Sequence, residues 1–172
     1  KDLIEGTIDL GLVPVAVIPQ LKEWWLIGDH CIGCVGPVSS VCIFSEVPIE
    51  KVERILLDYQ SRTSVELAKL LIRDYWKLDA EMVNAGQDFQ EEIRGTTAGL
   101  VIGDRSFEQR KVSPYIYDLG EAWMAHTGLP FVFAAWISNK KLPDEFVNSF
   151  NDANAYGVKH ISEVIASMQK ND

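Results

Sequence analysis

Ser61 to Ser64 carry the residue types that could bind a carboxylate. They read SRTS between an apolar strand and an apolar helix, so their hydroxyls lie beside the unpaired N–H groups of a first helical turn. Those groups and the positive end of the helix dipole favour an anion. Thr63 and Ser64 are therefore candidate binding residues, and Arg62 could add a two-pronged contact to the same carboxylate. Alternatively, Thr63 only caps its own helix, with Glu66 reaching back in a capping box.

A second candidate segment is the loop GPVSS, Gly36 to Ser40, which places two hydroxyls directly before a predicted strand. Ser39 and Ser40 are its candidate reactive residues, with Val38 beside them. The chain has no G-x-S-x-G elbow, and none of its three histidines follows a pattern that would activate a serine. The sequence therefore does not indicate a hydrolase, and an ordinary turn is the alternative to a functional loop.

A metal or redox centre is not favoured. His30, Cys31 and Cys34 form an HCxxC cluster, but a zinc site needs about four ligands and no second pair follows. The cysteines are more simply explained as small buried thiols. We therefore expect no metal and no cofactor.

Composition argues against two further classes of protein, those that bind nucleic acid and those that span a membrane. The net charge of −9 argues against a nucleic-acid partner, because phosphate binding relies on clustered Lys and Arg. The longest apolar runs, Leu10 to Ile18 and Leu129 to Ile137, are far short of the roughly 20 residues that cross a bilayer. An odd number of cysteines, three, in a chain of this size fits a reducing cytoplasm. An anionic ligand would then be held by local N–H and hydroxyl donors.

The elements that must position these residues alternate between strands and helices, which predicts an α/β fold with a largely parallel sheet. Ligands of such sheets bind beyond the carboxyl ends of the strands. Pro14, the SRTS turn and Gly103-Asp104 lie at such ends, although Asp104 could instead cap the following turn. The expected strands are 8–17, 41–45, 54–59, 97–103 and 129–138; the expected helices are 1–5, 48–54, 63–76, 119–127, 143–154 and 157–166.

Five segments, read together, resemble the chorismate dehydratase family of the futalosine route to menaquinone. They are GTIDLGLVPVAVIP, GPVSSVCIFSE, SRTSVELAKLLI, AGLVIGD and YDLGEAWMAHTGLPFVFAAW, and the match runs from about Asp2 to Ile165. This family is similar to type II periplasmic binding proteins, with two α/β lobes, mixed and mostly parallel sheets, helices on both faces and two crossover strands. The resemblance implies a first lobe of residues 1–44 plus 130–172, a second of 45–129, and crossings at SVCIFSE and LPFVFAAW.

The resemblance also implies a function, the dehydration of chorismate to 3-[(1-carboxyvinyl)oxy]benzoate by a cytoplasmic enzyme without a cofactor. Ser40 takes the family's catalytic serine position, with Ser39 as its competitor. The family's amino-terminal strand, which carries a catalytic asparagine, and its carboxyl-terminal helical segment have no counterpart here, so we expect an incomplete first lobe. The substrate-binding residues that we expect are Pro14, Val38, Ser39, Arg62, Thr63, Ser64, Gly103 and Asp104.

Two other functions are alternatives. A sister enzyme that makes 1,4-dihydroxy-6-naphthoate has the same fold, but the GPV-x-S loop and the SRTS turn favour chorismate dehydratase. A non-catalytic solute-binding protein for a small carboxylate would share the lobes and would be exported. The sequence leaves the oligomeric state open.

Overall fold

The computed structural model describes residues 1–168, and the chain divides into two compact units. The first comprises Lys1–Val13, Ile18–Ile32 and the chain from Ala134 onward; the second comprises Pro14–Val17 and Gly33–Phe133. We expected divisions after residues 44 and 129, whereas the chain passes between these units after Val13, Val17, Ile32 and Phe133. The segment SVCIFSE, which we expected to cross between lobes, lies inside the second unit.

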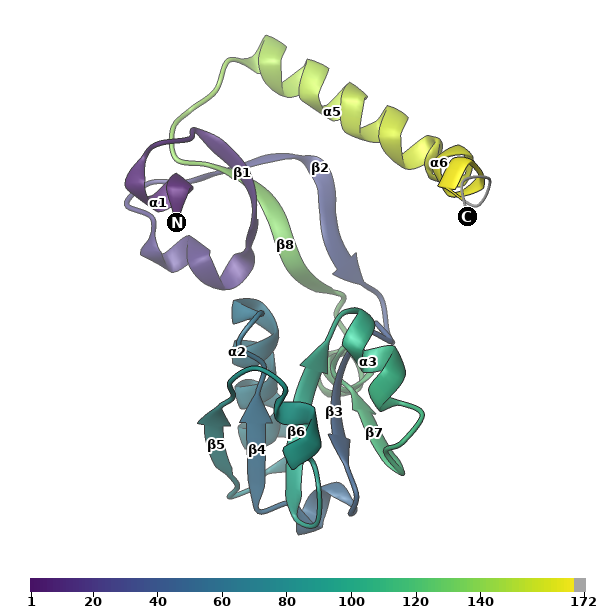
Figure 1. The fold of residues 1–172 in the computed structure, drawn as a ribbon. Coiled ribbons are helices and arrows are strands. Elements are labelled where there is room, and N and C mark those ends of the chain that lie inside the picture. The colour runs from purple at the N-terminus through teal and green to yellow at the C-terminus, as the bar shows by residue number, and fades with distance from the viewer. Residues whose placement is uncertain (169–172) are drawn as a thin grey trace. The chain divides into compact units, whose positions relative to one another are not determined.

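The first unit is built on a three-stranded sheet of order β1-β8-β2. The strand expected over 8–17 is shorter, because a 3₁₀ helix containing Pro19 replaces its second half. The helix expected to end at Asn154 continues to Lys159, through the expected start of the next helix at Gly157. The bounds are α1 Asp2–Glu5, β1 Leu10–Pro14, η1 Val15–Gln20, β2 Trp25–Cys34, β8 Phe131–Ser138, α5 Asp144–Lys159 and α6 Ile161–Met168 (Figure 1).

The second unit is built on a five-stranded sheet of order β5-β4-β6-β3-β7. The strands expected over 41–45 and 97–103 and the helix over 119–127 are confirmed, to within one residue. The bounds are β3 Val41–Ser45, η2 Ile49–Lys51, β4 Arg54–Leu57, α2 Arg62–Leu71, the π-helix η3 Ile72–Trp76, β5 Glu81–Asn84, η4 Phe89–Glu92, β6 Thr97–Ile102, α3 Asp104–Gln109, β7 Tyr115–Asp118 and α4 Leu119–Thr127 (Figure 1).

This sheet is mixed. Strand β4 is parallel to β5 and to β6, whereas β3 is antiparallel to β6 and to β7, so β3 runs against the other four strands. Val41 pairs with Ile102, and Cys42 pairs with Asp118. The register therefore brings the start of β3 and the ends of β4, β6 and β7 to one edge of the sheet. The expected α/β class with mixed sheets is confirmed.

Two apolar layers cover the sheet because side chains alternate between its faces. Ile43 points into a core with α2, η3 and α4, whose buried residues include Leu67, Leu71 and Leu119. Phe44 points to the other face, where Phe89 and Ile93 cover it. The edge that carries the polar loops is thus supported from both sides by packed side chains.

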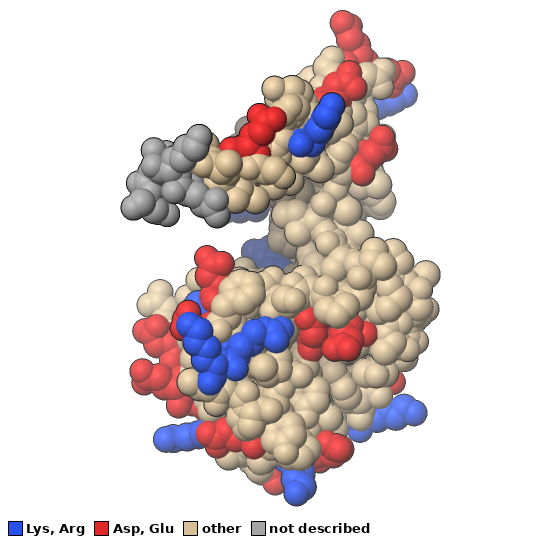
Figure 2. Space-filling model, turned by 90° about the vertical axis from the view of Figure 1, so that its right-hand side faces the viewer, with Lys and Arg blue, Asp and Glu red and all other residues tan. Residues whose placement is uncertain are grey.

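Among the described residues, no helix combines the length and the apolar character that crossing a membrane requires. Acidic and basic side chains are interspersed over the second unit on the face drawn in Figure 2. This mixture differs from the continuous basic surface that binds nucleic acid.

Candidate active site

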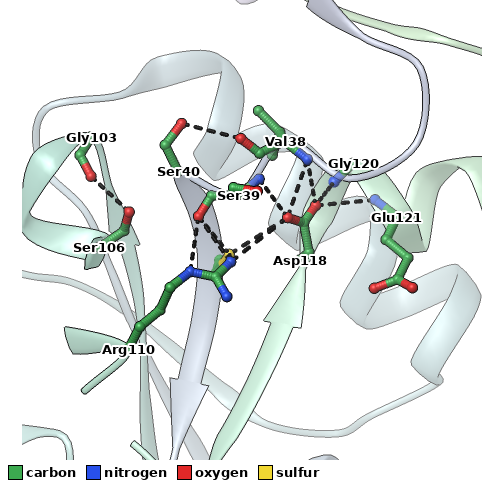
Figure 3. A network of polar contacts seen from close by, with 10 residues as sticks. Val38, Ser39, Ser40, Gly103, Ser106, Arg110, Asp118, Gly120 and Glu121 are labelled. Atoms are coloured by element: carbon green, nitrogen blue, oxygen red, sulfur yellow. Dashed lines mark hydrogen bonds and ion pairs between the residues drawn. The ribbon is translucent and has the colours of Figure 1, made fainter. Parts of the chain in front are cut away.

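The loop before β3 is held by the carboxylate of Asp118, the last residue of β7 (Figure 3). Both of its oxygens accept from the N–H of Val38, at 3.0 and 3.1 Å, and Oδ2 accepts from the N–H of Ser39 at 2.6 Å. Oδ1 also caps α4 by accepting from the N–H groups of Gly120 at 2.9 Å and Glu121 at 3.1 Å. One buried carboxylate therefore joins two segments about 80 residues apart.

Ser39 has a left-handed backbone, with φ at 64°. For a residue with a Cβ this conformation is about 1–2 kcal/mol less favourable than the right-handed one. The guanidinium of Arg110 offsets this strain by donating to the Ser39 carbonyl from Nε at 3.1 Å and from Nη2 at 2.9 Å (Figure 3). The Ser39 peptide is thus bonded on its N–H side by Asp118 and on its carbonyl side by Arg110.

Ser40 follows this fixed peptide and enters β3. Its carbonyl accepts from the N–H of Gly103 at 2.8 Å, which places it beside the end of β6. Its half-buried hydroxyl donates to the Val38 carbonyl at 3.5 Å, the outer limit of a hydrogen bond. The hydroxyl is therefore available to a ligand at this edge of the sheet.

The thiol of Cys42 lies beneath the loop, fully buried. Arg110 Nη2 lies 3.1 Å from its sulfur, and Asp118 Oδ2 lies 3.8 Å away. Burial, together with the Asp118 charge, raises the pKa of Cys42 to about 12, although Arg110 opposes the shift. The same two causes raise the pKa of Cys34, burial being the larger. Neither pKa fits a reactive thiolate at neutral pH.

The start of α2 differs in detail from the expected capping box. Ser61 is the N-cap, because its hydroxyl accepts from the N–H of Ser64 at 3.1 Å, while Glu66 pairs with Lys69 at 2.8 Å. The prediction of Thr63 as the cap is wrong. Ser64 is buried and its hydroxyl accepts from Ser61 at 2.8 Å. The N–H groups of the first two helical residues have no intrahelical acceptor and remain available to an anion.

Thr63 joins this helix start to the segment that follows β1. Its buried hydroxyl oxygen accepts from the N–H of Ala16 at 3.3 Å, which leaves its hydroxyl proton free to donate. Beside it is a mostly apolar hollow of about 210 Å³. Val15, Ala16, Thr63, Glu66, Leu67, Leu70, Trp123 and Phe131 line it. Pro14 is the residue before this lining, and Ser40 is not part of the lining.

Comparison with known proteins identifies the chain's family. A sequence model described as menaquinone biosynthesis matches residues 1–172. The chain belongs to the menaquinone biosynthesis family. A chorismate dehydratase of Thermus thermophilus is 26% identical over 188 residues, which cover 94% of this chain and 66% of that protein. The chain thus spans slightly less than two thirds of this relative's length.

Solved structures agree with the fold of this menaquinone-family chain. A crystal structure of a protein from Archaeoglobus fulgidus matches with a TM-score of 0.69 at 17% identity, covering 96% of this chain and 64% of that one. An ABC transporter structure from Parabacteroides distasonis matches with a TM-score of 0.56 at 15% identity, covering 99% and 63%. These likenesses cover nearly the whole chain and support its mixed α/β fold.

Four of the expected site residues meet within the second unit of this family member: Val38, Ser39 and Ser40 lie in one loop, and the N–H of Gly103 donates to the Ser40 carbonyl. Arg62 is exposed at the start of α2, and Asp104 is exposed in the first turn of α3 without capping it. The cap suggested for Asp104 is thus absent. Among the described residues, no group of His, Cys, Asp and Glu could hold a metal, including the HCxxC cluster.

Sequence reasoning missed the charged residues that fix this edge. Asp118 precedes α4 in YDLG and could have been found as a helix cap. Arg110 has no sequence signal. Asp58 was also missed: its fully buried carboxylate binds Arg105 at 2.6 Å and the Ile102 N–H at 3.1 Å. These ion pairs hold the loops that carry the candidate residues.

Proposed function

We propose that this chain carries the chorismate dehydratase activity of its family, converting chorismate to 3-[(1-carboxyvinyl)oxy]benzoate and water. The observation that carries the proposal is the match to a chorismate dehydratase over 94% of the chain. The available Ser40 hydroxyl and the open N–H groups of α2 support it, because they are donors suited to a dianionic substrate. We propose further that the enzyme is cytoplasmic and needs neither a cofactor nor a metal.

The reaction breaks two bonds on neighbouring ring carbons. The carbon that bears the enolpyruvyl ether loses its proton, and the next carbon loses its hydroxyl group. The electron pair of the C–H bond completes the aromatic ring, and proton and hydroxide leave as water. No oxidant or reductant is consumed. Because aromatisation favours the product, the protein need mainly hold the reacting groups in position.

In this proposal the enolpyruvyl carboxylate of the substrate takes the proton. Ser40 hydrogen-bonds the departing hydroxyl or that carboxylate, and Ser39 is the competing candidate. A second carboxylate lies at the start of α2, where Thr63 donates its hydroxyl proton and the main-chain N–H groups complete the contact. The Ser64 hydroxyl accepts from Ser61 and likewise keeps its own proton, so Ser64 remains a proposed contact of this carboxylate. Pro14, Val38, Arg62, Gly103 and Asp104 remain proposed substrate contacts.

The test is to incubate the full-length protein with chorismate and to follow the aromatic product by absorbance and by mass. Turnover far above the uncatalysed rate is expected, and Ser40→Ala should lower kcat by about 100-fold while KM changes little. Ser39→Ala serves as the matched control for the choice of serine. Binding of chorismate without turnover would instead favour a solute-binding protein, and no binding would refute the proposal.

A further inference from the structure

The carboxylate of Asp118 is placed where it cannot serve the reaction directly. Its two oxygens together accept from the N–H groups of Val38, Ser39, Gly120 and Glu121, and the residue is only 8% exposed. A group whose lone pairs are occupied by four main-chain donors has no room for a substrate proton. Any effect of Asp118 on the reaction must therefore pass through the segments that it holds.

Those segments include the peptide immediately before Ser40. Asp118 holds the N–H of Ser39, and Arg110 holds its carbonyl with two donors, so that the left-handed conformation is fixed at both ends (Figure 3). The Arg110 Nη2 atom lies 3.9 Å from Asp118 Oδ2, so the two groups also balance each other's charge. The backbone direction at Ser40, the next residue, therefore depends on the contacts of both Asp118 and Arg110.

We propose that Asp118 and Arg110 are positioning residues that hold the Ser39 peptide in its left-handed conformation and thereby aim the Ser40 hydroxyl at the substrate. This inference rests on the proposed function, in which Ser40 contacts the reacting groups. In this inference neither charged residue touches the substrate. Both act through the Ser39 peptide.

Asp118→Asn tests the contact with little change in size. An amide has one acceptor oxygen, and its NH₂ group would point donors at the N–H groups of the loop or of α4. Arg110→Gln removes the two-pronged donor to Ser39, whereas Arg110→Lys keeps the charge without the fork. Lys111→Gln is the matched control, because Lys111 is the next residue and forms an exposed pair with Glu108.

The first experiment measures hydrogen exchange of the main-chain N–H groups of Gly36, Val38, Ser39 and Ser40, which requires no substrate. Asp118→Asn and Arg110→Gln should speed exchange in this segment by about tenfold or more, because the bonded N–H groups open more often. Lys111→Gln should leave it unchanged. If exchange stays at the wild-type rate in Asp118→Asn, the carboxylate does not fix the loop and the inference is overturned.

The second experiment separates positioning from general stability by a double-mutant cycle on chorismate turnover. Asp118→Asn alone should lower kcat by about 100-fold with a small change in KM, as misplacement of a reacting group does. In a Ser40→Ala background the same change should lower kcat by no more than about threefold, because the hydroxyl that it aims is already gone. Arg110→Lys should retain more activity than Arg110→Gln.

Equal losses in both backgrounds would assign Asp118 a purely structural role and overturn the inference. If the wild-type protein does not turn over chorismate, the proposed function fails, and the catalytic part of this inference fails with it. The exchange experiment still decides in that case whether Asp118 and Arg110 fix the loop. The two failures are therefore distinguishable.

Discussion

The N–H of Gly103 donates a 2.8 Å hydrogen bond to the carbonyl of Ser40, which ties the end of β6 to the start of β3. Gly103 adopts φ 66° and ψ −152°, a region in which residues with a Cβ are strained. The chemistry proposed for Ser40 therefore depends on a backbone conformation that glycine alone adopts easily.

Gly103→Ala should accordingly misplace Ser40. We expect it to destabilise the fold by about 1–3 kcal/mol and to lower kcat more than it raises KM. Gly86→Ala is the control, because an added methyl group there meets nothing within 4 Å and the residue lacks a positive φ. Chemical denaturation and steady-state kinetics measure both effects. Wild-type kcat in Gly103→Ala would show that this backbone does not aim the hydroxyl.

How much of this site could be predicted depends on whether its contacts are local. The helix at 119–127 was predicted to the residue because Gly128 ends it in a left-handed conformation, which only neighbouring residues determine. The bond between Asp118 and Ser39 joins positions 79 apart and leaves no periodic trace in the sequence. Arg110 acts on a main-chain carbonyl, which every residue has, so no pattern points to it.

The prediction of Thr63 as the cap of α2 was wrong because two neighbouring residues fit that position. Ser61 and Thr63 both fit a helix start, and the spacing of Thr63 and Glu66 favoured the capping box. The structure begins the helix two residues earlier than that box requires, because Ser61 reaches Ser64 and Glu66 pairs with Lys69. Strand β2 was missed because its pattern is not one of regular alternation.

Ser61→Ala and Thr63→Val should therefore have different effects. Loss of the Ser61 cap should destabilise the protein by about 1 kcal/mol, with little change in KM because α2 still presents its first N–H groups. Thr63→Val keeps the volume but removes the hydroxyl, so we expect KM for chorismate to rise by about tenfold. Thermal unfolding and kinetics of both variants check this. Equal effects on KM and stability in the two variants would contradict the separate roles.

Gly120 lets the loop approach α4. A Cβ added there would lie 2.5 Å from the Gly36 carbonyl oxygen and 2.7 Å from the Cys34 sulfur, so the loop or the helix must move. Gly120→Ala should weaken the Asp118 contacts and lower both stability and kcat. Gly157→Ala, in the last turn of α5 where an added methyl group meets nothing within 4 Å, should instead stabilise the protein by about 0.5–1 kcal/mol. Equal melting temperatures for the two variants would contradict this expectation.

The buried Cys42 thiol beneath the loop should make the free energy of unfolding depend on pH in the alkaline range. The Cys42 pKa is about 12 in the folded chain against 9.0 for an ordinary thiol, because burial and Asp118 disfavour the thiolate. Between these two values the unfolded chain loses the proton and the folded chain keeps it, so the free energy of unfolding should fall as pH rises. The slope for one such group is at most about 1.4 kcal/mol per pH unit.

The measurement is urea denaturation between about pH 8 and pH 10.5 of the wild type and of Cys42→Ala, a range that starts below the ordinary thiol pKa. The other groups that titrate there are common to both proteins, so the difference in slope isolates Cys42. We expect the wild type to lose stability more steeply above the ordinary thiol pKa, and the two slopes to agree below it. Parallel curves throughout would mean that the thiol titrates equally in the folded and unfolded chains, and would contradict a raised Cys42 pKa.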